Sequence, residues 1–334
     1  MGDNRRQRPL GAERTHDMTE NRTRRWFLKT SAAAGASVGL GASVVTELLS
    51  SSPVFGADLP DLAAVSGTDG FTSTVAAVDR LGGMSRFVSP GSRVAVNANT
   101  SFKLPGSNVE PAVILATLQM CFDAGAKEVW LVKGGKPGYW ERTPRFAESK
   151  DLLAKTKTSE QDFKVVEVPD GIALKEAHVD SRVLESDHYL NVSVVKDHAG
   201  TRFTGALKNS MGFCPHQPTN SFCHFGSVPP DRGSFYANVD HLSQCIADLN
   251  LIRTPDLCLV DATAYLKTNG PAGPGELGRA DKVVAGTDPV AIDAYCTRFV
   301  DLQPGDVKMI GMAQKHGVGT ADLKTIRIVE GSVG

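Results

Sequence analysis

Short runs of apolar, mostly β-branched residues alternate with longer stretches of helical periodicity along most of the chain. The apolar runs predict strands at residues 94–97, 127–132, 163–168, 189–195, 257–261 and 325–329. The stretches between them predict helices at 111–124, 144–156, 238–249, 289–299 and 305–316. This alternation is typical of a mainly parallel sheet with helices on both faces. We therefore expect an α/β fold, with two α/β lobes around a cleft as an alternative arrangement.

Two long stretches interrupt this rhythm. Residues 196–237 and 262–281 have almost no periodic pattern, and each follows a strongly apolar predicted strand. Long irregular connections inside a compact domain are usually functional or disordered. In open parallel sheets, ligands bind beyond the carboxyl ends of the strands. We therefore expect the two stretches to converge on one cleft.

The pattern divides the chain into three parts. Residues 1–57 are a signal peptide with its basic leader, as argued below. Residues 58–93 are punctuated by Gly, Ser and Pro and predict a segment that wraps the surface. Residues 94–331 form the α/β domain, with 196–237 as its long functional loop.

Paired arginines precede the first apolar stretch. Residues 23–29 read Thr-Arg-Arg-Trp-Phe-Leu-Lys, and a run of small, mildly apolar residues follows at 32–45. A basic segment before a modest apolar stretch is typical of a signal peptide. This one resembles the twin-arginine signal. The resemblance implies passage through the twin-arginine translocon as a folded protein, with a periplasmic or otherwise exported location. A cytoplasmic protein with an accidental arginine pair, or a retained N-terminal anchor, are the alternatives.

Charge and hydropathy exclude two classes of protein. The net charge is −1, but residues 1–29 hold eight Lys or Arg against four Asp or Glu, so the remainder is acidic. A nucleic-acid-binding protein needs a basic face, and we predict no nucleic-acid partner. No apolar run after the signal is long and pure enough for a permanent membrane span.

The first irregular stretch begins with basic and amide side chains. Lys196, His198, Lys208 and Asn209 supply ammonium, imidazole and amide groups, which suit a small anion such as a carboxylate or phosphate. Burial lowers the pKa of a lysine and makes it a base. We therefore treat these four residues as catalytic candidates. The alternative is that they are solvated loop residues.

The same stretch continues with two Cys/His pairs. Cys214 and His216, followed by Cys223 and His224, are the ligand types of tetrahedral zinc or of mixed Cys/His iron–sulfur ligation. We therefore consider these residues a candidate site for a metal ion or an iron–sulfur cluster. A disulfide between the two cysteines, or four residues with neither role, are the alternatives. The remaining cysteines lie among apolar neighbours and predict small buried side chains: Cys121, Cys245, Cys258 and Cys296.

Carboxylates and glycines near strand ends add further candidates. Asp261 ends an apolar strand and is a candidate catalytic carboxylate. Asp288 precedes Pro289 and predicts a helix N-cap, whereas Asp293 suits either a buried structural role or the site. Gly270 and Gly273 are candidate cofactor-binding residues, because backbone amides at glycines approach anions closely. The alternative for both glycines is an ordinary turn.

Three motifs in fixed order resemble domain-of-unknown-function family 362. The first is Asn-x-x-x-x-Lys-x-His at residues 191–198 with Thr-Gly-Ala-Leu-Lys-Asn at 204–209 and Gly212. The second is the strand 256–261 followed by Asn-Gly-Pro at 269–271, and the third is residues 285–294. The resemblance covers about 94–331 and supports a site role for Lys196, His198 and Lys208.

The chain departs from the family pattern in two places. Many members carry Lys-Pro-Asn after the first strand, where this chain has Asn-Ala-Asn at 97–99. Many also carry a ferredoxin-like module, but this chain has no Cys-x-x-Cys, which excludes a two-cluster module.

These observations predict an exported enzyme that depends on a metal or an iron–sulfur cluster and acts on a small anionic substrate. The alternatives are a non-catalytic periplasmic ligand-binding or maturation module, and a non-redox isomerase that uses Lys/His acid–base chemistry. The chain lacks the motifs of P-loop nucleotidases, dinucleotide-binding folds, serine hydrolases and zincin proteases.

Overall fold

An eight-stranded mixed sheet forms the centre of the computed structural model, which describes residues 59–227 and 238–334. The predicted signal peptide at 1–57 and part of the loop 196–237 lie outside the described residues. Across the sheet the order is β14–β1–β13–β10–β7–β2–β3–β4. The strands are β1 (Leu62–Ser66), β2 (Arg93–Ala98), β3 (Glu128–Leu131), β4 (Lys157–Thr158), β7 (His188–Val194), β10 (Leu257–Ala262), β13 (Lys282–Gly286) and β14 (Ile328–Ser332).

Most neighbouring strands of this sheet are parallel. Only β13 runs antiparallel, to β10 on one side and to β1 on the other. The remaining pairs are all parallel. The predicted mainly parallel sheet is confirmed.

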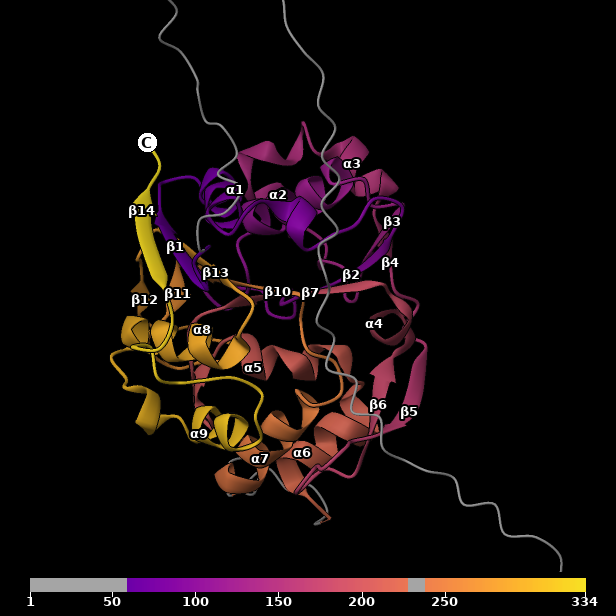
Figure 1. Cartoon of the computed structure of the whole chain (residues 1–334), viewed down its shortest axis with the longest axis vertical. Helices are drawn as coiled ribbons and strands as arrows, with labels where there is room; N and C mark the ends of the chain where they lie inside the picture. Colours follow the sequence, from indigo (N-terminus) through magenta and orange to yellow (C-terminus); the bar gives the residue numbers. More distant parts are fainter. Residues whose placement is uncertain (1–58, 228–237) are drawn as a thin grey trace, which may run out of the picture. The chain divides into compact units, whose positions relative to one another are not determined.

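Helices cover both faces of the sheet, as predicted (Figure 1). On one face lie α1 (Gly70–Arg80), α2 (Pro111–Asp123) and α3 (Lys150–Lys155). On the other lie α5 (Ala206–Asn209), α6 (Ser221–Phe225), α7 (Val239–Leu249), α8 (Pro289–Cys296) and α9 (Lys308–Lys315), while α4 (Ser181–Glu185) precedes β7. Three two-stranded sheets complete the fold: β5 (Phe163–Glu167) with β6 (Glu176–Asp180), β8 (Lys196–His198) with β9 (Arg202–Thr204), and β11 (Tyr265–Leu266) with β12 (Leu277–Gly278).

Local sequence signals explain where the principal helices begin. Pro111 occupies the first turn of α2, where a missing N–H costs nothing. The side chain of Asp288 accepts hydrogen bonds from the N–H groups of Val290 and Ala291 at the start of α8. The predicted N-cap role of Asp288 is thus confirmed. Asn238 caps α7 in the same way, through the N–H of His241.

The prediction that 58–93 wraps the surface was wrong. Residues 62–66 form β1, which lies inside the sheet between β13 and β14, and residues 70–80 form α1. The run Leu-Ala-Ala-Val is short and made of small residues, so the Gly and Pro residues around it dominated the sequence pattern. The domain consequently begins before residue 94.

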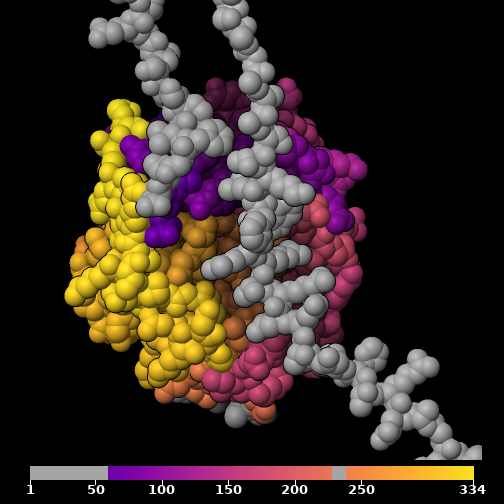
Figure 2. Space-filling view, viewed as in Figure 1, coloured from indigo at the N-terminus to yellow at the C-terminus, as the bar shows by residue number. Residues whose placement is uncertain are grey.

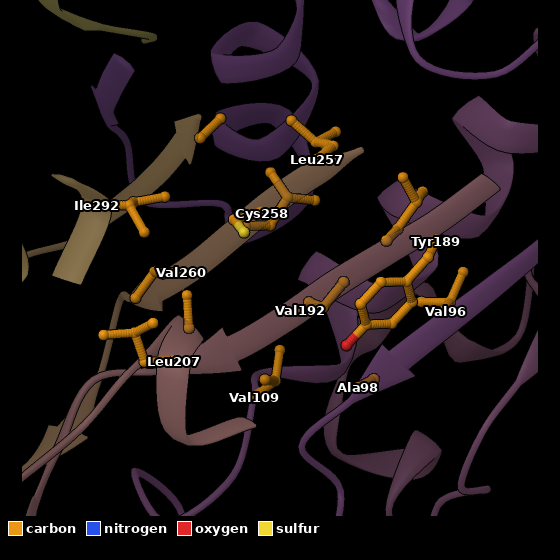
Figure 3. Close-up of a cluster of buried hydrophobic side chains, with 14 of the residues drawn as sticks. Val96, Ala98, Val109, Tyr189, Val192, Leu207, Leu257, Cys258, Val260 and Ile292 are labelled. Carbon is orange, nitrogen blue, oxygen red and sulfur yellow. The ribbon is translucent and has the colours of Figure 1, made fainter. Parts of the chain in front are cut away.

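The core is centred on strands that are buried on both faces. Every residue of β10 is buried, and so is every residue of β7 after His188. Figure 3 shows Val96, Val192 and Val260 among these apolar side chains, with the hydroxyl of Tyr189 at one side. That hydroxyl accepts a hydrogen bond from Asn97 Nδ2 at 3.2 Å. Within the described ranges, no helix combines the length and apolar character needed to cross a bilayer.

Candidate functional site

A cavity of about 420 Å³ lies beyond the carboxyl ends of β2, β3 and β7. Its walls come from residues 98–102 after β2, from Lys133 after β3, from the irregular stretch 196–225, and from Pro271 in the second irregular stretch. The two stretches therefore meet at one site, as expected from their positions after strands. Parallel strands place such loops at one edge of the sheet.

Basic side chains dominate this cavity. Three lysines and three histidines line it, and no aspartate or glutamate does so among the described residues. We call it the cationic cavity; its six basic residues are Lys133, Lys196, Lys208, His198, His216 and His224. Positive charge without a counter-charge creates a strong preference for an anion.

Lys196 is the most deeply buried of the lysines, with 1% of its surface exposed. Its ammonium lies 4.2 Å from the centre of the Phe102 ring and donates a hydrogen bond to the carbonyl of Ser107. Burial, and secondarily the charge of Lys208, lower the pKa of Lys196 well below its ordinary value. The ring and one carbonyl only partly replace the water that an ammonium loses on burial.

Lys208 extends from α5, a single turn of helix that is anchored at both ends. Asp293 accepts hydrogen bonds from the N–H groups of Ala206 (2.6 Å) and Leu207 (3.0 Å). After the lysine, Asn209 Nδ2 donates to the side-chain oxygen of Asn191 at 2.7 Å. The backbone that carries Lys208 is therefore fixed on both sides.

The amino group of Lys208 has a weak partner. Its Nζ lies 3.6 Å from the thioether sulfur of Met211. Burial lowers the pKa of Lys208 to about 8, against a smaller opposing effect of the neighbouring Cys223. About a tenth of this amine is therefore neutral at pH 7, far more than for an ordinary lysine.

Backbone contacts fix opposite neutral tautomers on two histidines of the cationic cavity. Nδ1 of His198 accepts the N–H groups of Gly200 (3.0 Å) and Thr201 (3.2 Å), so its proton is on Nε2. Nδ1 of His224 lies 2.7 Å from the carbonyl of Asn220 and must donate, so the neutral ring has its lone pair on Nε2. Burial lowers the pKa of His224 to about 4 and that of His198 further. One ring thus supplies a donor and the other an acceptor.

The four residues of the predicted metal site do not form one. His216 and His224 line the cationic cavity, whereas Cys214 and Cys223 are fully buried and do not line it. In residues 59–227 and 238–334, no three His, Cys, Asp or Glu side chains converge as a metal ion requires. Burial raises the pKa of the Cys214 thiol, which opposes the thiolate that a metal needs. The four residues therefore do not converge in the described part of the chain, and a metal ion or iron–sulfur cluster stays a prediction.

The disulfide alternative is not found either, since both cysteines are free thiols. Cys223 instead contacts Cys245 of α7, whose sulfur lies 3.5 Å from Nε2 of His241. The other cysteines predicted to be small buried side chains are all buried and free.

Asp261 is buried and does not line the cationic cavity. It is completely buried and accepts hydrogen bonds from the N–H of Glu110 (2.7 Å) and from the N–H and hydroxyl of Thr263 (2.8 and 2.7 Å). It joins the end of β10 to the start of α2. Asp293 was predicted to have either a buried structural role or a role in the site. The structure shows the structural role, because its carboxylate accepts the hydrogen bonds that anchor α5.

The two glycines proposed to bind a cofactor already use their amides within the chain. The N–H of Gly270 donates to Asp197 Oδ2 at 2.9 Å, and that of Gly273 donates to the carbonyl of Asn269 at 3.0 Å. A Cβ at Gly270 would lie 1.7 Å from the carbonyl oxygen of Asp197, so the glycine permits a close backbone approach. Turn formation, the alternative for these residues, is what the structure shows.

Sequence analysis missed Lys133 and Phe102. Lys133 comes directly after β3, and burial lowers its pKa. Phe102 lies in the loop after β2. Both follow parallel strands, and the same strand-end rule that selected the loops 196–237 and 262–281 points to them.

Comparisons with known proteins place the chain in a family without assigning a reaction. A thylakoid-associated protein of Synechocystis sp. is 25% identical over 252 residues, which cover 72% of this chain and 73% of that protein. The structure of the lactate racemase apoprotein from Thermoanaerobacterium thermosaccharolyticum aligns with a TM-score of 0.38 and 14% identity. That alignment covers 61% of this chain but only 52% of the other, so the chain spans about half of its length. The family model described as domain of unknown function (DUF362) matches residues 94–298, more than half of the chain, and the protein therefore belongs to this family.

Proposed function

We propose that this protein is an enzyme that binds a small organic anion in the cationic cavity and transfers a proton on it. One observation carries the proposal: three lysines and three histidines line the cavity, and no carboxylate among the described residues offsets the charge of the lysines. A bound carboxylate or phosphate supplies the missing negative charge. The volume of about 420 Å³ suits a small metabolite rather than a polymer.

Lysines supply the binding energy in this proposal. The ammonium of Lys196 is buried and has one protein hydrogen bond, so two of its N–H groups remain for an anion. Lys133 lies on the wall contributed by β3. Hydrogen bonds between ionised partners are about twice as strong as neutral ones.

Histidines supply the proton transfer. His224 presents the lone pair of Nε2 and accepts a proton, whereas His198 presents Nε2–H and stabilises negative charge that develops on the substrate. The isomerase alternative leaves the base open between a lysine and His198. The two N–H groups that its Nδ1 accepts make it the donor instead, and move the role of base to His224.

Anion binding is tested first by calorimetric titration with inorganic phosphate, acetate and malonate at constant ionic strength. We expect binding by the wild-type protein and at least about tenfold weaker binding by Lys196→Met. Lys150→Gln removes an exposed lysine of α3, outside the cavity, and is the matched control. Equal loss in both variants, or no binding to the wild type, would contradict the proposal.

Turnover is tested by proton exchange. A panel of acetate, malonate, succinate and pyruvate is incubated with the protein in D₂O, and deuterium incorporation is followed by nuclear magnetic resonance. We expect faster exchange for a carboxylate that binds, and loss of that exchange in His224→Asn. Binding without exchange of any bound anion would instead favour the non-catalytic ligand-binding module.

We also propose that the protein is exported by the twin-arginine route, as residues 23–29 suggest. Expression in a bacterial host with an active translocon, followed by fractionation, tests this location. We expect the wild-type protein in the periplasm and the doubly substituted Arg24→Lys, Arg25→Lys protein in the cytoplasm. Identical fractions for both proteins would reject the proposal.

A further inference from the structure

The surroundings of the Lys208 amino group suit a nucleophile as well as a positively charged anion-binding group. Lys208 lines the cationic cavity, and its Nζ lies 3.6 Å from the thioether sulfur of Met211, a poor substitute for water or a carboxylate. Lysines held in this way favour the neutral amine, which attacks carbonyl carbon. Burial of Lys208 favours the neutral amine, and no carboxylate lines the cavity in the described part of the chain to stabilise the ammonium.

We propose that Lys208 forms an imine with the carbonyl carbon of a small oxo acid bound in the cationic cavity. This proposal rests on the anion site proposed above and names the class of its ligand. The carboxylate of the oxo acid binds Lys196, and the carbonyl faces Lys208. A cavity of about 420 Å³ holds an acid of this size.

The fixed backbone of α5 supports this role. Hydrogen bonds from Ala206 and Leu207 to Asp293 hold the residues before the lysine, and Asn209 holds those after it. A nucleophile on a fixed backbone reaches the same point in every molecule, which is what a reaction with a bound carbonyl requires. Lys208 has a pKa of about 8, which leaves about a tenth of the amine neutral at pH 7.

The two histidines complete the proton balance. Nζ attacks the carbonyl carbon, a C–N bond forms and the C=O double bond opens, while Nε2–H of His198 donates a hydrogen bond to the oxygen. His224 Nε2 accepts the first proton that the nitrogen loses and passes it to the oxygen, which gives a neutral carbinolamine. The nitrogen lone pair then expels the hydroxyl group, which takes up the second nitrogen proton through His224 and leaves as water, so a C=N bond forms. No electrons are gained or lost, so the step needs neither oxidant nor reductant.

Borohydride trapping with pyruvate tests the proposal. Borohydride reduces an imine to a stable amine, and one pyruvate adds about 72 Da to the protein. We expect one such adduct in the wild-type protein, assigned to Lys208 by peptide mass spectrometry. Adduct formation is expected to need both pyruvate and borohydride and to increase with pH between 7 and 9. Inorganic phosphate, which competes for the anion site, is expected to reduce it.

Three variants make the test specific. Lys208→Met is expected to lose the adduct and to unfold at a denaturant concentration close to that of the wild-type protein, which shows that it folds. Lys150→Gln is expected to retain the adduct. Lys133→Met removes a neighbouring positive charge, keeps the nucleophile, and is expected to give a smaller yield at Lys208.

The outcomes separate this inference from the proposed function. Phosphate binding without a pyruvate adduct at Lys208 overturns the imine and leaves the anion site intact. Adducts spread over surface lysines at similar yields overturn it as well. An adduct at Lys208 without phosphate binding supports the imine and contradicts the general anion site.

Discussion

The carboxylate of Asp293 occupies the space that a side chain at Gly205 would need, since an added Cβ would lie 2.2 Å from its Oδ1. The carboxylate reaches from α8 to the first N–H groups of α5. The position of Lys208 therefore depends on a residue that does not line the cationic cavity. Burial raises the pKa of Asp293 to about 7, although both N–H donors act in the opposite direction.

Replacing this carboxylate is expected to damage both stability and binding. Asp293→Asn exchanges one acceptor oxygen for an NH₂ group that faces a backbone N–H. At pH 8, we expect the free energy of unfolding to fall by about 1–3 kcal/mol and phosphate affinity to fall as α5 loses its anchor. Denaturant unfolding and calorimetry measure the two effects.

Asp288→Asn is the control for that experiment. This residue also caps a helix, but through the first turn of α8 and away from the cavity. We expect a loss of stability of about 1 kcal/mol or less without a change in phosphate affinity. If both variants bound phosphate equally well, Asp293 would have no positioning role.

We expect the buried ammonium of Lys196 to lower the free energy of unfolding while it strengthens anion binding. Its ammonium is almost fully buried, with one carbonyl and one ring as partners. Lys196→Met removes the desolvated charge and keeps most of the volume, so we expect the free energy of unfolding to rise by about 1–3 kcal/mol. Chemical denaturation tests this expectation. A less stable variant would show that the lysine contributes more to folding than its burial costs.

His224 predicts a dependence of stability on pH. Its pKa is about 4 in the folded protein, below the ordinary value of 6.5. Between these values the unfolded chain binds a proton that the folded protein does not, so this group makes stability fall as the pH decreases from 6.5 to 4.

His224→Asn is designed to remove that dependence. The amide of asparagine replaces the Nδ1–H donor to the carbonyl of Asn220 and does not titrate in this range. Denaturant unfolding at intervals between pH 4 and 7 is expected to give a flatter profile for the variant. Parallel profiles would show that His224 is not held neutral.

Asp261 is expected to affect folding but not the site. Its two oxygens accept three hydrogen bonds from Glu110 and Thr263, and it does not line the cationic cavity. We expect Asp261→Asn to lower the free energy of unfolding by about 1–3 kcal/mol and to leave phosphate affinity unchanged. A selective loss of affinity would return Asp261 to the candidate site.

The sequence predicts the central sheet well and its outer parts less well. Strands such as β7 and β10 are buried on both faces, so their apolar runs stand out from their surroundings. β1 is also buried, but its small residues between Gly and Pro resemble a surface segment. The predicted strand at 163–168 forms, as β5, but it pairs with β6 outside the central sheet, because period and composition do not encode the pairing partner.

The candidate site, too, could be predicted from the sequence only in part. Lys196, His198, Lys208 and Asn209 meet at one cavity because their motif follows a parallel strand. The Cys/His prediction rests on ligand type, which does not determine where a side chain points: the imidazoles of His216 and His224 line the cavity, while both thiols pack in the core. The protonation states of His198 and His224 depend on backbone groups that only the folded chain brings near them.

The place of β1 in the sheet has a consequence for biosynthesis. Its two neighbours, β13 and β14, are formed by residues 282–332, so an early part of the described chain pairs with a late one; Figure 2 shows the two ends of the colour scale side by side. Until residues 282–286 have left the ribosomal tunnel β1 has neither partner, and until residues 328–332 follow one of its edges is still open. The sheet therefore closes only after residue 332 has left the ribosomal tunnel, and until then the nascent chain offers chaperones an apolar strand with an open edge.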